Sequence, residues 1–177
     1  MEYLDVVRVM IKLELLSLKA KTVFDLCLQK NITIATAESC TGGLISMAIT
    51  QIPGSSAVFD RGFITYSNSS KIESIGVDKR IIDRYGAVSS EVARAMAKGA
   101  LSHSGAEFSL AITGIAGPSG GSKCKPVGTV HIAVLNKNNV INSQKYMFSG
   151  DRDDIRLTAS LSALELLTFS IKKYHCS

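Results

Sequence analysis

The stretch Ile32-Thr33-Ile34-Ala35-Thr36-Ala37 runs directly into Glu38-Ser39-Cys40-Thr41-Gly42-Gly43, so a short apolar run meets a polar turn that ends in two glycines. A run of this length that is rich in β-branched residues favours a buried strand. Beyond the turn, apolar residues recur with helical spacing between 44 and 49, which predicts a helix that begins near Ser39 or Thr41 and ends by Pro53-Gly54. A strand, a glycine turn and a helix in this order predict an α/β fold.

Two later segments repeat the pattern of a strand that ends in a polar turn. Residues 58–66 alternate with strand periodicity and place Tyr66 at the C-terminal end, where a polar cap predicts a short helix carrying Lys71. Residues 108–112 form another strand, which leads into the glycine-rich loop 113–121. In an α/β sheet such strand ends converge on one edge, where ligands bind.

The remaining periodic segments complete the expected architecture. They are helices over 4–28, 89–104 and about 150–172, and strands over 128–135 and 140–148 with a hairpin turn between them. Early alternation of strands with helices and a late hairpin indicate a three-layer α/β/α sandwich with a mixed sheet. No repeat or linker divides the chain, so we expect one domain over residues 19–177 after a helical extension over residues 1–18.

The N-terminal helix has an unusually narrow charged stripe. Asp5, Arg8, Lys12 and Lys19 share one side of the helix, and apolar residues fill most of the remaining circumference up to Leu18. This apolar arc is broader than one domain face can bury. We therefore expect the first turns to pack against a second subunit as well, in a homo-oligomer.

Composition and charge exclude several classes of protein. Of 177 residues, 46% are apolar and 20% are charged, which fits a domain with a sizeable core and argues against a mainly disordered chain. The longest uncharged stretch, 39–59, contains polar residues and glycines and is not a membrane span. The N-terminus carries acids where a secretory signal has basic residues, so a cytoplasmic protein is expected.

Neither a metal nor a cofactor is expected from the residue pattern. The four cysteines show no CxxC spacing and the three histidines lie far from most of them, so no metal site can be written. The net charge of +5 is spread in ones and twos and the chain has no Trp. A mildly basic surface explains this charge better than nucleic-acid binding does.

Three turns could carry chemistry, and each has a plainer alternative. A Ser39 hydroxyl at a helix N-terminus could stabilise an alkoxide or a bound anion, although an ordinary helix cap has the same pattern. Lys71 could be a general base with the Tyr66 phenol as a proton relay, or a solvated surface lysine. The loop 113–121 could offer backbone N–H groups to a carbonyl oxygen or phosphate, or be a mobile surface loop.

Familiar catalytic signatures are absent from the sequence. There is no GxSxG elbow, no HExxH helix, no P-loop and no GxGxxG fingerprint. Cys40 stands at the expected helix start beside Ser39, where a thiol can have a low pKa, but a small buried residue is the simpler interpretation. Local motifs alone therefore leave the reaction open.

A resemblance that extends over most of the chain narrows the range of possible reactions. Its segments are 37–43, 54–56, 61–68, Lys71, 86–89, 113–118, 125–129 and 150–152. In this order and spacing they resemble the C-terminal domain of the competence/damage-inducible CinA proteins, from about Lys19 to the end of the chain. The resemblance implies an α/β/α fold found as an oligomer. It also implies the activity of the family's stand-alone nicotinamide-nucleotide amidases, which convert nicotinamide mononucleotide into nicotinate mononucleotide and ammonia.

The resemblance also assigns roles to individual residues. It places the nucleophile on Ser39, its partners on Tyr66 and Lys71, a supporting hydroxyl on Thr113 and a substrate-binding guanidinium on Arg152. Further substrate contacts are expected from the two glycine turns, at Thr41, Gly42, Gly43, Gly114 and Gly117. These groups would hydrolyse an amide without metal or cofactor. A catalytically silent nucleotide-binding or interaction module of the same family is the alternative from a different class.

Overall fold

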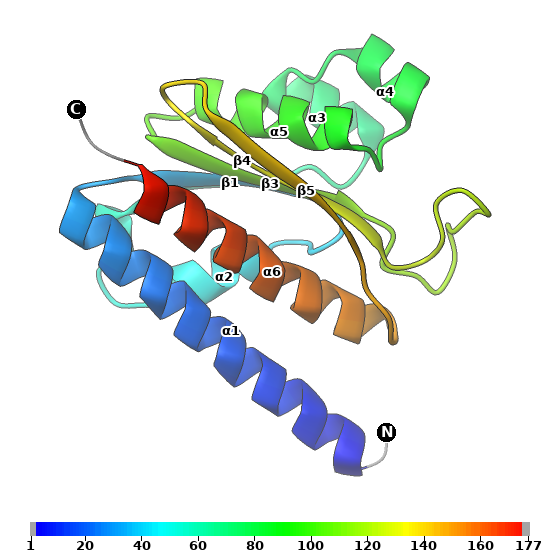
Figure 1. Ribbon diagram of the computed structural model, residues 1–177, viewed down its shortest axis with the longest axis horizontal. Helices are drawn as coiled ribbons and strands as arrows, with labels where there is room; N and C mark the ends of the chain where they lie inside the picture. The colour runs from blue at the N-terminus through cyan, green and yellow to red at the C-terminus, as the bar shows by residue number, and fades with distance from the viewer. Residues whose placement is uncertain (1–2, 175–177) are drawn as a thin grey trace.

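A mixed five-stranded sheet divides the molecule into three layers (Figure 1). The computed structural model describes residues 3–174, with side chains from residue 6. The strands lie in the order β2-β1-β3-β4-β5; β1 is parallel to β2 and β3, whereas β4 is antiparallel to β3 and β5. Their bounds are β1 Ile34–Glu38, β2 Phe59–Ile64, β3 Phe108–Gly114, β4 Thr129–Asn136 and β5 Ile141–Met147.

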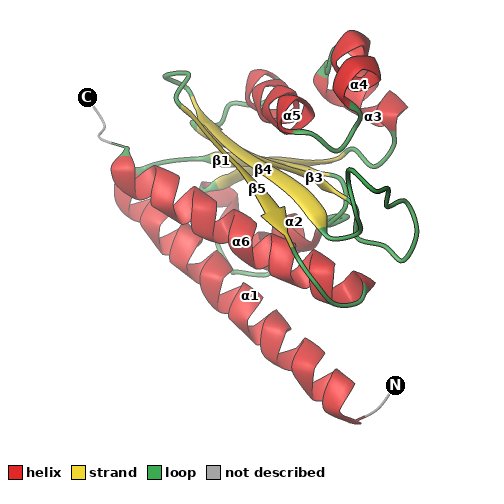
Figure 2. Cartoon of the chain, turned by 45° about the vertical axis from the view of Figure 1, so that its right-hand side comes forward, coloured by secondary structure: helices red, strands yellow, loops and turns green. Residues whose placement is uncertain are grey.

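Helices cover both faces of this sheet (Figure 2). One layer contains α1 (Tyr3–Lys30), α2 (Leu44–Thr50) and α6 (Arg152–Lys173), and the other contains α3 (Asn68–Ile75), α4 (Lys79–Tyr85) and α5 (Ser90–Ser102). Each layer encloses its own apolar core against the sheet. Successive side chains of a strand point to opposite faces, so Ala111 and Ile112 of β3 enter different cores. The expected three-layer α/β/α sandwich is confirmed.

Two helices differ from the sequence-based expectation. α2 begins at Leu44, several residues after Ser39, because Gly42 and Gly43 take left-handed φ values of 61° and 96° that interrupt a helix. α4 was not expected at all. It has seven residues with an Asp78 cap, and so short a charged segment shows no clear helical period.

The charged stripe of α1 faces inward, toward α6. Arg8 and Lys12 form ion pairs with Asp154, and Lys19 pairs with Glu165. α1 runs through residue 18 without a break, so the expected extension continues directly into the domain. The Asp5 side chain lies outside the described side chains. The charged stripe takes up the side of α1 that faces α6, and large apolar side chains elsewhere on α1 are exposed by 37–62%, at Met10, Ile11, Leu13, Leu15 and Leu18.

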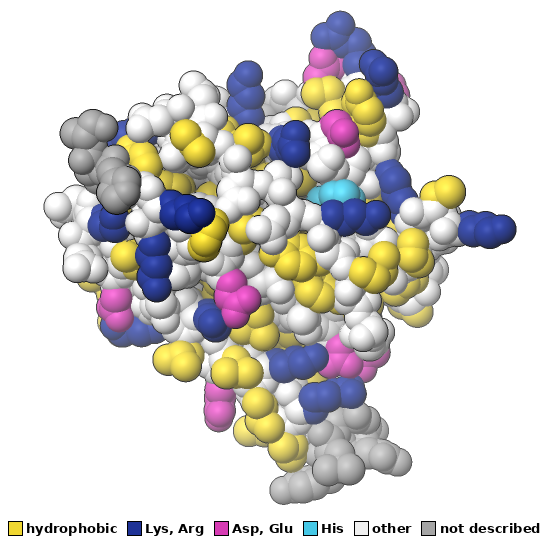
Figure 3. All heavy atoms as spheres, viewed as in Figure 1, with side chains coloured by type: hydrophobic (Ala, Val, Ile, Leu, Met, Phe, Trp, Pro, Cys, Tyr) yellow, Lys and Arg dark blue, Asp and Glu magenta, His cyan; other side chains and the backbone are white. Residues whose placement is uncertain are grey.

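Hydrophobic side chains are visible along the projecting half of α1 in Figure 3. A second copy of this chain remains the occupant that we expect for this face. Among residues 3–174, no helix combines the length and the hydropathy needed to cross a bilayer.

We expect the double substitution Ile11→Glu/Leu18→Glu to lower the sedimentation coefficient, because two charges would be forced into an apolar contact between subunits. Sedimentation velocity is the measurement. Leu28→Glu, at another exposed apolar position near the other end of α1, is the control and should leave the profile unchanged. An unaltered profile for the double variant would show that this face does not mediate assembly.

Candidate active site

Glu38 organises the turn that follows β1. Its carboxylate is fully buried and accepts five hydrogen bonds. Oε2 accepts from the Thr41 hydroxyl and from the N–H groups of Gly43 and Ile45, and Oε1 accepts from the N–H and hydroxyl of Ser46. The carboxylate thus caps α2 from the preceding strand, where Gly43 itself provides no side-chain cap. Sequence reasoning assigned Glu38 no role, because an acid at the end of an apolar run resembles an ordinary residue of a polar turn.

This capping changes the expected setting of Ser39. Ser39 lies in the turn and not at the first turn of α2, and the N–H groups at the start of α2 already donate to Glu38. The expectation that Ser39 or Thr41 begins the helix is therefore wrong. The left-handed glycines at 42 and 43 are the physical cause.

Ser39 instead meets Lys71 across the ends of two parallel strands. The carboxyl ends of β1 and β2 are adjacent, since Glu38 pairs with Ile64. Three residues beyond β2, Ser67 caps α3, so that the first turn of α3 directs Lys71 back toward the end of the sheet. Lys71 Nζ lies 3.0 Å from Ser39 Oγ, within hydrogen-bond distance.

The Lys71 side chain is almost completely buried, with 1% exposure. Its Nζ donates to the Thr65 carbonyl at 2.8 Å and lies near the carbonyls of Tyr66 and Ser67. Burial lowers the pKa of Lys71 to about 8, because an ammonium loses its hydration there. A surface position for Lys71 is therefore excluded. The lowered pKa means that a minor fraction of the Lys71 amine is neutral and basic near physiological pH.

A cavity of about 320 Å³ opens on the exposed side of Ser39. The expected site residues that line it are Ser39, Tyr66, Thr113, Gly114, Gly117 and Arg152. Thr113 lines the cavity, and its hydroxyl donates to the Ala87 carbonyl. This hydrogen bond connects loop 86–89 to β3. Gly114 has no Cβ, and one built there would lie 2.9 Å from the Thr129 carbonyl and 3.1 Å from Cys40 Sγ. The absent side chain lets the end of β3 approach the Ser39 turn.

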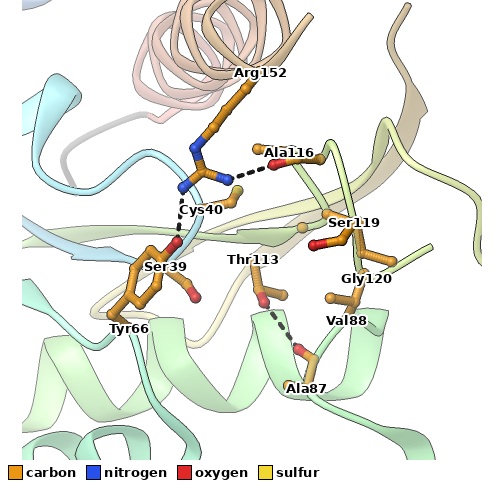
Figure 4. A pocket seen from close by; sticks show the side chains of 13 residues that line it. Ser39, Cys40, Tyr66, Ala87, Val88, Thr113, Ala116, Ser119, Gly120 and Arg152 are labelled. Atoms are coloured by element: carbon orange, nitrogen blue, oxygen red, sulfur yellow. Dashed lines mark hydrogen bonds between the residues drawn. The ribbon is translucent and has the colours of Figure 1, made fainter.

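Tyr66 and Arg152 meet across the cavity mouth (Figure 4). The Arg152 guanidinium donates to Tyr66 Oη at 2.8 Å and to the Gly117 carbonyl at 2.6 Å. The Tyr66 hydroxyl therefore points to Arg152, and the tyrosine contributes its carbonyl to the Lys71 environment. A proton relay from Ser39 through the phenol stays a prediction, since the recorded partner of the phenol is Arg152.

Thr41, Gly42 and Gly43 are not among the described residues that line the cavity. Thr41 is buried with its hydroxyl on Glu38, and its carbonyl accepts from Arg156 Nη2 at 3.0 Å. Gly43 also donates to Glu38. The geometry gives these three residues a structural part in shaping the turn. Their predicted contact with substrate stays a prediction, since these three residues do not line the described cavity.

Cys40 also lines the cavity but is poorly suited to attack. Its side chain is 5% exposed, and burial raises the pKa of its thiol to about 12. A thiol with this pKa is protonated at neutral pH. Within the described residues, no group of three or more His, Cys, Asp or Glu side chains could hold a metal ion.

The fold and site together define an α/β protein with a buried serine–lysine pair beside a cavity at the carboxyl ends of parallel strands. Comparison with known families makes this class specific. The CinA C-terminal domain model matches residues 17–171, and the chain belongs to this family.

Individual relatives agree with this assignment. Nicotinamide-nucleotide amidohydrolase PncC of Enterobacter agglomerans is 51% identical over 132 residues, which is 75% of this chain and 80% of that protein. A CinA-like protein of Geotalea uraniireducens is 51% identical over 78% of this chain and 33% of its own length. The crystal structure of competence/damage inducible protein CihA from Agrobacterium tumefaciens has a TM-score of 0.87 and 42% identity, covering 90% of this chain and 96% of that one.

Several relatives are much longer than this chain. It spans 33–37% of the length of three curated relatives that it matches at 49–51% identity. The similarity to these longer proteins therefore concerns one part of each.

We expect Glu38→Ala to destabilise the fold by at least about 3 kcal/mol, because several buried donors would lose their acceptor at once. Urea unfolding followed by circular dichroism gives the free energy of unfolding. Glu73→Ala, at an exposed acid on α3, is the control and should change it by less than about 0.5 kcal/mol. Equal stability of the two variants would contradict the capping role of Glu38.

Proposed function

We propose that this protein is a nicotinamide-nucleotide amidase, which hydrolyses the carboxamide of nicotinamide mononucleotide to nicotinate mononucleotide and ammonia. The observation that carries the proposal is the 3.0 Å contact between Ser39 Oγ and the buried Nζ of Lys71 at the cavity edge. The 51% identity to a protein named nicotinamide-nucleotide amidohydrolase supports the choice of substrate.

The first half of the reaction forms an ester on Ser39. Neutral Lys71 takes the Ser39 proton as Oγ attacks the carboxamide carbon. Backbone N–H groups of the Ser39 and Thr113 turns donate to the oxyanion. The C–N bond then breaks, and the leaving nitrogen takes the proton from Lys71 and departs as ammonia.

The second half restores the serine. Water attacks the ester carbon while Lys71 accepts a proton from it. The bond between the carbon and Ser39 Oγ breaks, Oγ recovers a proton from Lys71, and the carboxylic acid is released and loses its proton to solvent. The sum is one amide and one water converted into one carboxylic acid and one ammonia. Neutral Lys71 serves as base and its protonated form as acid, so each half needs the lysine to change state.

Arg152 is the group that we assign to the 5′-phosphate of the substrate. Its guanidinium stands at the cavity mouth, and its two recorded contacts, to Tyr66 Oη and the Gly117 carbonyl, leave further N–H groups for an anion. A planar guanidinium can hold a phosphate through two parallel hydrogen bonds. The cationic side chain thus holds the charged end of the nucleotide at the mouth, while the amide reaches Ser39.

We expect Ser39→Ala to remove nearly all hydrolysis of nicotinamide mononucleotide, because the ester cannot form; losing a nucleophile costs several kcal/mol in the barrier. An ammonia-release assay on folded protein measures this. Cys40→Ala is the matched control on the adjacent lining residue and should retain most activity. Loss of activity in the Cys40 variant alone would transfer the nucleophile to the thiol. An inactive wild-type protein would favour the silent module.

We expect kcat/KM to rise with pH through an apparent pKa of about 8, because Lys71 of the free protein accepts the Ser39 proton only as a neutral amine. One pH unit below that value, only about one tenth of the molecules have Lys71 deprotonated. A pH–rate profile between about 6 and 9 is the measurement. A flat profile, or normal turnover in Lys71→Met, would contradict the base role.

A further inference from the structure

Side chains of α1 form ion pairs and hydrogen bonds with the first turns of α6. Lys12 Nζ donates to Asp154 Oδ1 at 2.8 Å and to Thr158 Oγ1 at 3.3 Å, and Arg8 lies 3.2 Å from carboxylate oxygens of both Asp151 and Asp154. α1 and α6 lie side by side in both ribbon views (Figure 1, Figure 2). The inward stripe of α1 therefore meets the start of α6.

The carboxylate in this contact is enclosed. Asp154 is 4% exposed. Gly150, four residues earlier, packs so closely on it that a Cβ added to this glycine would lie only 2.6 Å from the Asp154 Cβ. The hydrogen bond from Lys12 is the main reason that the pKa of Asp154 is lowered. Arg8 also pairs with Asp154, so loss of the Lys12 ammonium would leave this buried carboxylate with one cation in place of two. Lys12, the closer of the two cations, thus helps to hold this turn of α6 in place.

The same turn carries Arg152. Asp151 caps α6 by accepting from the Asp154 N–H at 2.9 Å, so that Arg152 lies between two residues fixed by α1. From there its guanidinium reaches the cavity mouth at Tyr66 and Gly117. Misplacing a binding group by about 1 Å is enough to weaken its contact strongly. Lys12 also precedes residue 17, where the match to the family begins.

We propose that Lys12 is a positioning residue for substrate binding, which acts through Asp154 to hold the Arg152 guanidinium where an anionic group of the substrate enters. This inference rests on the proposed function, since the anionic group is the phosphate of the mononucleotide. It adds a contribution of the N-terminal turns that the family match does not cover.

The test compares Lys12→Met with Lys12→Arg and Lys19→Met. Lys19 lies on the same helix and pairs with Glu165 of α6 at 2.9 Å, away from the first turn. Lys12→Met should raise KM for nicotinamide mononucleotide by about 3–10-fold while kcat changes less than about twofold. Lys12→Arg and Lys19→Met should keep the wild-type KM. Arg152→Ala gives the upper limit of the effect, and the phosphate-free riboside should show no difference between Lys12→Met and wild type.

Several results would overturn the proposal: an unchanged KM in Lys12→Met, an equal KM rise for the riboside, or a fall in kcat alone. A second measurement is the rate of hydrogen exchange at the backbone amides of residues 152–156 in the same variants. This rate can be measured whether or not the protein is an active enzyme. Faster exchange in Lys12→Met but not in Lys19→Met supports the positioning step, and equal exchange overturns it, even if wild-type protein proves inactive and the proposed function fails. If Lys12→Met does not fold, Asp154→Asn provides the same comparison.

Discussion

The candidate site depends on one buried carboxylate. Glu38 ends β1 and gathers five donors from the next eight residues, so the chain turns sharply and leaves Ser39 outside the helix. An anion in an apolar layer is tolerated because helix N–H groups and hydroxyls replace its water. The N–H groups at the start of α2 therefore donate to the Glu38 carboxylate and not to the Ser39 hydroxyl. The Ser39 hydroxyl has Lys71 as its hydrogen-bond partner instead.

Burial of Lys71 costs stability in its ammonium form and makes this ammonium easier to deprotonate. Burying Lys71 disfavours its ammonium form, and the carbonyl oxygen of Thr65 compensates in part by accepting a hydrogen bond. Lys71 is not among the described residues that line the cavity, so Ser39 stands between the amine and the cavity. An amine behind the Ser39 hydroxyl keeps a lowered pKa, because solvent that would stabilise the charged form is excluded.

The sequence predicted most of the helices and strands and the meeting of strand ends, because periodicity and turn residues are local properties. It did not predict which side of α1 would face the domain. Periodicity identifies residues that share a face, but Lys12 points inward because Asp154, 142 residues later, lies opposite. The contact of Ser39 with Lys71 was expected only from the family resemblance, since it joins residues 32 positions apart. The role of Glu38 went unnoticed because a buried acid has no periodic signature.

The parallel pairing of β1 with β3 bears on how the chain folds. Paired residues of these strands, such as Ile34 and Phe108, lie 74 positions apart, and α2 to α5 come between them in the sequence. Contacts across such separations form late, because a long loop must close before they stabilise anything. Ser39, Lys71, Thr113 and Arg152 come from segments spread over most of the chain. The candidate site therefore assembles only after the central strands pair, and a partly folded chain lacks it.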